Sequence, residues 1–209
     1  MHCNEMSNLH NKIKLYNNQI TQFSENISKT ILELSNLLFP ILERSSTIYI
    51  TGIGKSNLIA KKTVATWQSI NIKAYNLLVQ DLLHGDIGII KKGDVIIYIS
   101  NSGNTTELVE VAKYIKNIYS VSSSDSEIRI MQICISNNEN NMLNNYVDYS
   151  YSIGPEKIIE ADNNNIVPTV SSVLFLMLTD LLGIELSEKN NFTKEDFKKN
   201  HPCGLGSQI

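Results

Sequence analysis

The chain has 209 residues, of which 42% are apolar and 19% are charged, so it is long enough for one substantial folded domain and is not a disordered protein. Its net charge of −3, without a cluster of Lys and Arg, argues against nucleic acid as a partner. After the N-terminal part, the longest wholly apolar run is residues 173–178, far below the roughly 20 residues that span a membrane, and no signal-peptide core precedes it. We therefore expect a cytoplasmic protein without a membrane partner, in which Cys3, Cys134 and Cys203 are reduced thiols.

Residues 1–46 carry apolar side chains at helical spacing from Leu9 to Leu38, which predicts one amphipathic helix or a pair that packs on the rest of the protein. Pro40 is expected to end or restart that helix. From residue 47 the pattern changes to short apolar runs, loops and further helices. The expected strands are 48–51, 74–79, 95–99, 128–135 and 147–153; the expected helices cover 60–67, 108–115, 168–182 and 194–199, and residues 119–127 are expected to form a loop.

A polar loop at residues 100–107 follows the apolar run 95–99, which is typical of a parallel strand buried on both faces. The helix after the loop therefore begins at the carboxyl edge of the sheet, where ligands bind in such folds. Free backbone N–H groups, Gly103 and a series of hydroxyl and amide side chains predict that this loop receives an anion such as phosphate. The alternative is an ordinary Ser/Thr-rich turn that caps a helix.

A second loop, Gly-Ile-Gly-Lys-Ser at residues 52–56, lies between a strand and a helix. It is not a nucleotide-triphosphate P-loop, because Tyr49 stands where that motif needs glycine. It is not a dinucleotide fingerprint either, because Asn57 stands at the third glycine position. Lys55, directly after the Gly-x-Gly turn, is expected to face an anionic substrate; otherwise it is a solvated surface lysine.

Three further residues are candidates on their position in the chain. His84 follows the second strand rather than lying on an apolar helix face; the alternative is a histidine of the core. Glu160 precedes the polar stretch 162–165 and could be a base or a solvated carboxylate. His201 and Pro202 begin a rigid, then glycine-containing tail that could deliver an imidazole to a specific place.

The order of these segments resembles the sugar isomerase (SIS) domain of arabinose-5-phosphate isomerases. The resemblance extends from about Thr47 to Gly206 and rests on Gly-Ile-Gly-Lys-Ser at 52–56, His-Gly-Asp at 84–86, Ile-Ser-Asn-Ser-Gly at 99–103, Pro-Thr at 168–169, and Glu-Asp-Phe followed by His-Pro-x-Gly at 195–204. It implies an α/β fold, namely a three-layer αβα sandwich on a five-stranded parallel sheet, in a domain that covers residues 47–209. It also implies a homotetramer with sites shared between subunits and the interconversion of ribulose 5-phosphate and arabinose 5-phosphate.

The resemblance also implies the site residues. The positions treated as catalytic in that family match Lys55, Glu107, Glu160 and His201. The positions that bind the sugar phosphate match Gly54, Ser56, His84, Ser100, Asn101, Ser102, Gly103, Thr105 and Thr106.

The sequence departs from the family pattern in several places. Family members usually continue into two CBS regulatory modules, whereas this sequence stops at Ile209, so we expect no regulatory nucleotide site. A second histidine that could join the first in holding an inhibitory metal would fall at Leu78, so we expect no metal site. Cys203 replaces a glycine of the tail, and Asn104 replaces an acidic residue of the loop.

The chemistry of aldose–ketose isomerisation fits these residues. A carboxylate moves a proton between adjacent carbons through an enediolate, and we assign this step to Glu160, with Glu107 shuttling protons or orienting groups. Lys55 would stabilise the enediolate oxygen, and His201 would transfer protons at the oxygens. No cofactor is expected, because the reaction is internally balanced. Isomerisation of another phosphosugar, such as a heptose or hexulose phosphate, and a non-catalytic sugar-phosphate sensor remain alternatives.

Overall fold

The computed structural model describes residues 2–121, 129–154 and 157–203, without the side chains of residues 2–5 and 119–121. Its centre is a parallel five-stranded sheet with the strand order β2-β1-β3-β4-β5. The expected α/β fold with a five-stranded parallel sheet is thus confirmed. The strands are β1 Ile48–Gly52, β2 Ala74–Leu78, β3 Val95–Ile99, β4 Met131–Ser136 and β5 Tyr149–Ser152.

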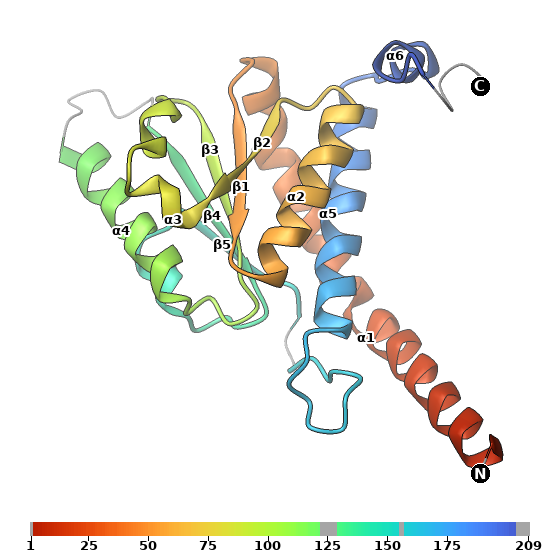
Figure 1. Cartoon of the computed structure of the whole chain (residues 1–209). Helices are drawn as coiled ribbons and strands as arrows, with labels where there is room; N and C mark the ends of the chain where they lie inside the picture. Colours follow the sequence, from red (N-terminus) through yellow and green to blue (C-terminus); the bar gives the residue numbers. More distant parts are fainter. Residues whose placement is uncertain (1, 122–128, 155–156, 204–209) are drawn as a thin grey trace.

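Helices cover both faces of the sheet, which gives the three predicted layers (Figure 1). One apolar core joins α1, α2 and α5 to one face, and a second core joins α3 and α4 to the other. Both β1 and β3 are buried along their whole length, as expected for strands covered from two sides. The α-helices are α1 His2–Glu43, α2 Lys55–Ser69, α3 Val79–Leu82, α4 Thr106–Val121, α5 Val170–Lys189 and α6 Lys194–Asn200, with 3₁₀ turns at Asp86–Ile89 and Met142–Asn145.

The helix α1 passes through Pro40 without a break, so the expectation that this proline ends or restarts the helix is wrong. Pro40 is exposed and lies three residues before the end of α1 at Glu43. The carbonyl that loses its hydrogen bond can therefore be hydrated, and little helix remains beyond it to be displaced. Leu38 and Ile41 on either side of Pro40 are buried in the core, and this packing favours the continuous helix.

The helix α5 is the apolar centre of its layer and packs against both α1 and α2. Over Val170–Lys189 it has a mean hydropathy of 1.7, which makes it the one helix in the described ranges long and apolar enough to cross a membrane. However, 56% of that stretch is buried inside the protein, as in the core helix of a folded domain. The helix also continues seven residues beyond its expected end at Leu182, because Gly183 lies inside it rather than after it. A Cβ at Gly183 would lie 2.5 Å from Nε1 of Trp67, so this glycine makes room for the fully buried indole.

Other element boundaries differ from the expected ones by a few residues. The strand β2 ends at Leu78, and Val79 already belongs to α3. The helix α4 extends to Val121, so residues 119–121 are helical and not a loop, while residues 122–128 lie outside the described residues. The last two strands begin later than expected, at Met131 and Tyr149.

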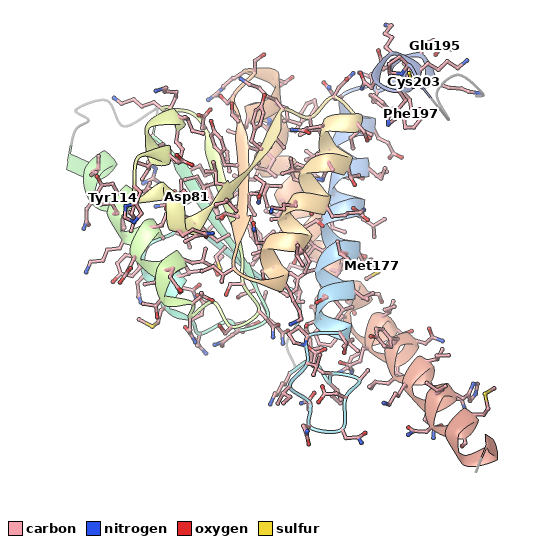
Figure 2. All side chains as sticks on the ribbon, viewed as in Figure 1. Asp81, Tyr114, Met177, Glu195, Phe197 and Cys203 are labelled. Carbon is pink, nitrogen blue, oxygen red and sulfur yellow. The ribbon has the colours of Figure 1, made fainter. Side chains whose placement is uncertain are left out.

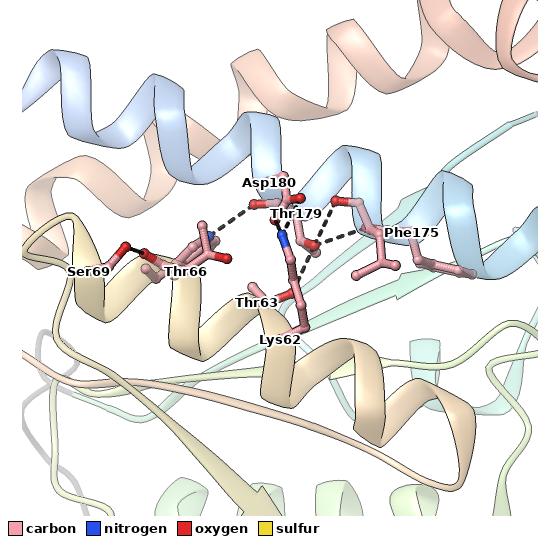
Figure 3. A network of polar contacts seen from close by, with 9 residues as sticks. Lys62, Thr63, Thr66, Ser69, Phe175, Thr179 and Asp180 are labelled. Carbon is pink, nitrogen blue, oxygen red and sulfur yellow. Dashed lines mark hydrogen bonds and ion pairs between the residues drawn. The ribbon is translucent and has the colours of Figure 1, made fainter. Parts of the chain in front are cut away.

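A polar network in the middle of α2 and α5 fixes the two helices relative to each other (Figure 3). The hydroxyls of Thr63 and Thr179 are 2.8 Å apart in the core, and Nε1 of Trp67 donates to the Thr179 carbonyl at 2.9 Å. At the surface, Lys62 forms an ion pair with Asp180. Buried hydroxyl and indole groups need partners with defined geometry, so this network fixes how far α2 and α5 are shifted along each other. That shift in turn determines which residues of their first turns lie opposite one another.

Candidate active site

The candidate site lies at the carboxyl edge of the sheet, around the ends of β1 and β3. These neighbouring strands are followed by connections that lead to opposite faces, since α2 packs in one core and α4 in the other. Such a point, where the strand order reverses, leaves a crevice outside the strand ends in open α/β sheets. The loop at residues 52–56 and the loop at residues 100–106 both lie at this crevice.

A pocket of about 150 Å³ opens at this edge between the first turns of α2 and α5. It brings together three residues predicted from the sequence, Lys55, Ser56 and Asn101, which come from two different loops. Ser171 and Ser172 complete the polar wall and were not predicted from the sequence. A signal was present, because only Val170 separates them from the Pro-Thr pair before α5. The remaining lining residues are Ile53, Ile59, Pro168 and Phe175.

Gly54 places Lys55 at the mouth of this pocket. Its backbone has φ 60° and ψ −122°, a combination that glycine adopts readily and residues with a Cβ avoid. The chain thus turns sharply out of β1, and Lys55 becomes the first residue of α2. The Lys55 side chain is exposed and has no hydrogen bond or ion pair within the described part of the chain, so its ammonium is available to an anionic ligand.

Glu160 is almost fully buried, with 7% of its surface exposed, and it lies at the N-terminus of α5. Its Oε2 atom accepts hydrogen bonds from the backbone N–H of Thr169 at 2.8 Å, from the Thr169 hydroxyl at 3.1 Å and from the backbone N–H of Ser171 at 3.3 Å. These donors belong to the N-cap residue and the first turn of α5, and the N-terminus of a helix favours a negative charge. The carboxylate therefore lies directly behind the pocket wall that Ser171 forms, and Oε1 has no partner among the residues described.

The loop at residues 100–106 is shaped from within by Ser100. This side chain is buried, and its Oγ accepts from the backbone N–H of Gly103 at 3.1 Å and lies 3.2 Å from Oγ1 of Thr105. Asn101 and Ser102 are exposed, although Oγ of Ser102 accepts from the backbone N–H of Asn104 at 3.2 Å. Ser100 and Thr105 therefore hold the loop in shape, while Asn101 and Ser102 are accessible to a ligand.

A second loop, at residues 137–142, supports the first one and was missed by sequence analysis. The backbone N–H of Met142 donates to Oδ1 of Asn104 at 2.8 Å, and the N–H of Leu143 donates to the Gly103 carbonyl at 3.2 Å. Gly103 has φ 66°, and a Cβ there would lie 2.3 Å from Cγ of Asn141. Only glycine lets the two loops approach so closely. The Asn-rich run after a strand was the only sequence signal for this contact.

A wider polar pocket of about 450 Å³ lies beside this second loop. It shares Asn101 with the smaller pocket and includes Lys157. Asn101 therefore contributes to both pockets at this edge of the sheet. The other lining residues are Asn137, Asn138, Glu139, Asn140 and Gly154.

Two predicted residues, Glu107 and His84, lie at this edge but outside the lining of the 150 Å³ pocket. Glu107 is exposed in the first turn of α4, one residue after Thr106 begins the helix. His84 is exposed between α3 and the turn Asp86–Ile89. Within the described ranges, no group of three or more His, Cys, Asp or Glu side chains could hold a metal ion.

His201 lies at the opposite end of the molecule from Lys55. It follows α6, whose Asn200 side chain donates to the carbonyl of Ser69 at 3.0 Å and to Oδ1 of Asn71 at 2.7 Å. Ser69 is the last residue of α2, and Lys55 is the first. A helix of this length separates its two ends by about 20 Å at 1.5 Å per residue. Figures 1 and 2 show α6 beyond the far ends of α2 and α5, so this chain does not bring His201 to its own pocket.

Comparison with known proteins identifies the family. The SIS domain profile matches residues 41–184, which is most of the chain and includes both loops and the start of α5. The chain belongs to the SIS domain family. The expected family resemblance is thus confirmed.

Named relatives of this SIS domain include arabinose 5-phosphate isomerases. It is 32% identical to the probable arabinose 5-phosphate isomerase of Haemophilus influenzae, over 94% of this chain and 54% of that protein. It is 36% identical to the arabinose 5-phosphate isomerase KdsD of Francisella tularensis, over 78% of this chain and 47% of that protein. The chain therefore spans about half the length of the curated relatives that it matches. The solved structure of E. coli CFT073 c3406 in complex with arabinose 5-phosphate superposes with a TM-score of 0.77 at 29% identity, covering 94% of this chain and 98% of that chain.

Proposed function

We propose that this SIS domain is an aldose–ketose isomerase that interconverts D-ribulose 5-phosphate and D-arabinose 5-phosphate. The proposal rests on one pocket, which is lined by Lys55, Ser56 and Ser171. The backbone N–H of Ser171 donates to the carboxylate of Glu160. A cation and a buried carboxylate beside one pocket are what enediolate chemistry needs. The names of the two curated relatives and the arabinose 5-phosphate complex of the structural relative support the same reaction.

Glu160 is the proposed base for the carbon-bound proton. Its Oε2 is held by Thr169 and Ser171, so the carboxylate has a fixed position, while Oε1 remains available for proton transfer. The base removes the proton from the carbon that carries the hydroxyl group, and the electron pair moves onto the neighbouring carbonyl oxygen to give the enediolate. Return of the proton to the other carbon, together with transfer of the hydroxyl proton from one oxygen to the other, completes the isomerisation. A positioned base of this kind contributes about 10²–10⁴ in rate.

Lys55 is proposed to stabilise the charge on the enediolate oxygen. An ammonium at the mouth of a partly enclosed pocket interacts more strongly with a developing oxyanion than it would in bulk water. The exposed Glu107 could pass protons between the site and solvent or orient a hydroxyl group.

The phosphate group is proposed to bind at the loop of residues 100–106, where α4 begins. Backbone N–H groups at a helix N-terminus favour an anion, and Asn101 and Ser102 are exposed there. Gly54, Ser56, His84, Thr105 and Thr106 complete the proposed substrate-binding set, with Ser100 and Gly103 keeping the loop in shape.

His201 is proposed to serve the site of a neighbouring subunit in a homotetramer. Its position beyond the far end of α2 supports this arrangement, because the imidazole must act within hydrogen-bonding distance of the substrate oxygens. A cytoplasmic location and the absence of any cofactor are part of the same proposal.

One assay tests the proposed function. The purified protein is incubated with ribulose 5-phosphate, and the sugar phosphates are separated and identified. We expect arabinose 5-phosphate to accumulate until it reaches equilibrium with ribulose 5-phosphate. Parallel incubations with hexulose and heptose phosphates test other isomerases of the same type; turnover of one of these alone would replace the proposed substrate. Tight binding of sugar phosphate without turnover would instead indicate a sensor.

A further inference from the structure

The helix α6 is fixed at both ends, although it has only seven residues. At its start, Thr193 and Asp196 form a capping box: the Thr193 hydroxyl accepts from the N–H of Asp196 at 3.2 Å, and Oδ2 of Asp196 accepts from the N–H of Thr193 at 3.0 Å. At its end, the Asn200 side chain donates to the carbonyl of Ser69, the last residue of α2, and to Oδ1 of Asn71. The helix is therefore a defined platform for the residue that follows it, His201.

The imidazole of His201 is held against one residue of this platform, Phe197. The two rings are stacked, with centroids 4.0 Å apart and planes inclined by 20°. In addition, Nδ1 of His201 lies 2.9 Å from the carbonyl oxygen of Phe197, which also accepts from the backbone N–H of His201 at 3.0 Å. Figure 2 shows Phe197 on α6, beyond the body of the domain.

This contact determines which ring nitrogen carries the proton. A carbonyl oxygen can only accept a hydrogen bond, so Nδ1 must be the donor when the bond is formed. In the neutral imidazole Nε2 then has the free lone pair, and it is directed away from the carbonyl. A second group that fixes the tautomer of a histidine is a common feature of histidines that transfer protons.

We propose that Phe197 is a positioning residue that holds His201 as the Nδ1–H tautomer, with Nε2 ready to accept a proton from a sugar hydroxyl. This inference rests on the proposed function, since it assigns His201 to proton transfer at the substrate oxygens. The ring of Phe197 restricts rotation of the imidazole, and its carbonyl selects the tautomer. Nε2 takes the hydroxyl proton and returns it to the other oxygen, so the imidazole is unchanged after each turnover.

The test uses the full chain and three variants. Phe197→Leu keeps an apolar side chain but removes the stacked ring, whereas Phe197→Tyr keeps the ring. His201→Ala identifies the signals of His201 among the four histidines of the chain. Long-range ¹H–¹⁵N NMR spectra of labelled protein, recorded where imidazole is neutral, report which nitrogen of His201 is protonated.

We expect the Nδ1–H form in the native protein and in Phe197→Tyr. In Phe197→Leu the backbone carbonyl remains, but without the stacked ring the imidazole can rotate away from it, so we expect a mixture of tautomers. In the isomerase assay, Phe197→Leu should lower kcat by about 2- to 10-fold, the effect of losing one aromatic contact, with little change in KM. Circular dichroism of each variant checks that α6 and the fold are retained.

An Nε2–H tautomer in the native protein, or a native tautomer and native kcat in Phe197→Leu, would overturn the inference. Failure of the proposed function has a different signature. In that case no isomerisation occurs even in the native protein, and the NMR spectra alone decide whether Phe197 fixes the tautomer.

Discussion

Glu160 and Thr169 are joined by two hydrogen bonds to a single carboxylate oxygen, one from the backbone N–H at 2.8 Å and one from the hydroxyl at 3.1 Å. Both donors belong to the residue that precedes α5, so the start of this helix fixes the carboxylate. The same helix start carries Ser171 and Ser172 into the pocket wall. The position of the proposed base and the shape of the pocket therefore depend on one short segment.

Substitution of Glu160 by Gln tests the proposed base. The amide oxygen of Gln can still accept from Thr169, so the fold should be retained, but the group can no longer take a proton. We expect kcat to fall by roughly 10² or more while sugar-phosphate binding persists. Steady-state kinetics and a binding titration measure the two effects separately. Ser102→Ala in the loop at residues 100–106 should do the reverse and weaken binding more than turnover.

Asp162→Asn is the matched control for Glu160→Gln. Asp162 lies in the same connection and also accepts backbone N–H groups, those of Asn164, Ile166 and Val167, and these bonds lower its pKa. It does not line the pocket. Equal losses of turnover in both variants would point to a disturbed loop rather than to a missing base. A near-normal rate in Glu160→Gln would move the base to Glu107.

The sheet, and the edge of the sheet at which the pocket lies, could be predicted because short stretches of sequence indicate both. The run of residues 95–99 is apolar on both faces, and the polar loop after it can lie only at the carboxyl edge of a parallel sheet. Pro40 and Gly183 were misinterpreted because tertiary packing overrode their local preferences. Leu38 and Ile41 hold α1 in the core around an exposed Pro40, and Gly183 makes room for Trp67. The support of Gly103 by Asn141 connects two loops about 40 residues apart, and no periodicity reports such a contact.

Gly103→Ala tests the contact between these two loops. The new Cβ would meet Asn141 at 2.3 Å, and Asn141 is itself bonded to the Asn138 carbonyl at 2.6 Å and to Ser136 at 3.2 Å. We expect a loss of about 1–3 kcal/mol in the free energy of unfolding, together with weaker sugar-phosphate binding. Denaturant unfolding measures the first effect. Gly54→Ala is the control, because φ is also positive at Gly54 but no atom lies within 4 Å of the added Cβ. An equal loss of unfolding free energy in both variants would exclude the loop contact as the cause.

Removal of metal ions tests the proposal that no metal takes part. Leu78 stands where a second metal-binding histidine would be expected, so His84 would have to act alone. We expect isomerase activity without added metal, and a chelator should not abolish it. The measurement is activity before and after chelation, followed by addition of divalent cations. Activity that appears only with a divalent cation would contradict this mechanism.

Alkaline pH should destabilise the fold through Cys134. Burial raises the pKa of this thiol from 9.0 to about 11, and hydrogen bonds from Ser136 and Ser150 offset only part of the effect. Because the folded protein holds the proton more tightly than the unfolded chain, this stabilisation is complete below pH 9 and is lost as the pH rises toward 11. The loss amounts to about 2 kcal/mol.

Cys134→Ala should therefore flatten the dependence of the free energy of unfolding on pH between 9 and 11, although the smaller side chain lowers stability at neutral pH. Urea unfolding at several pH values measures this. Burial also raises the pKa of Tyr98, so some dependence will remain. Cys203→Ala, at an exposed position, should follow the native profile. Parallel profiles for the native protein and Cys134→Ala would show that another group causes the alkaline loss.

The separation of Lys55 and His201 predicts complementation between inactive variants. Lys55→Ala and His201→Ala should each be nearly inactive. If each site draws Lys55 from one chain and His201 from another, a mixed oligomer contains some sites with both residues intact. An equal mixture, unfolded and refolded together, should recover roughly a quarter of the native activity, since each of the two choices is correct half the time.

Two controls make this experiment decisive. Variants carrying different affinity tags show, by sequential capture, that mixed oligomers have formed. A mixture of Lys55→Ala and Glu160→Gln should recover no activity, because Lys55 and Glu160 of one site come from the same chain. A single subunit supplies Lys55 and Ser171 to the pocket, and Ser171 is hydrogen-bonded to Glu160. No recovery from captured mixed oligomers of Lys55→Ala and His201→Ala would mean that His201 is not catalytic or acts in its own chain. The second case would require α6 to leave the end of α2, where Asn200 now holds it.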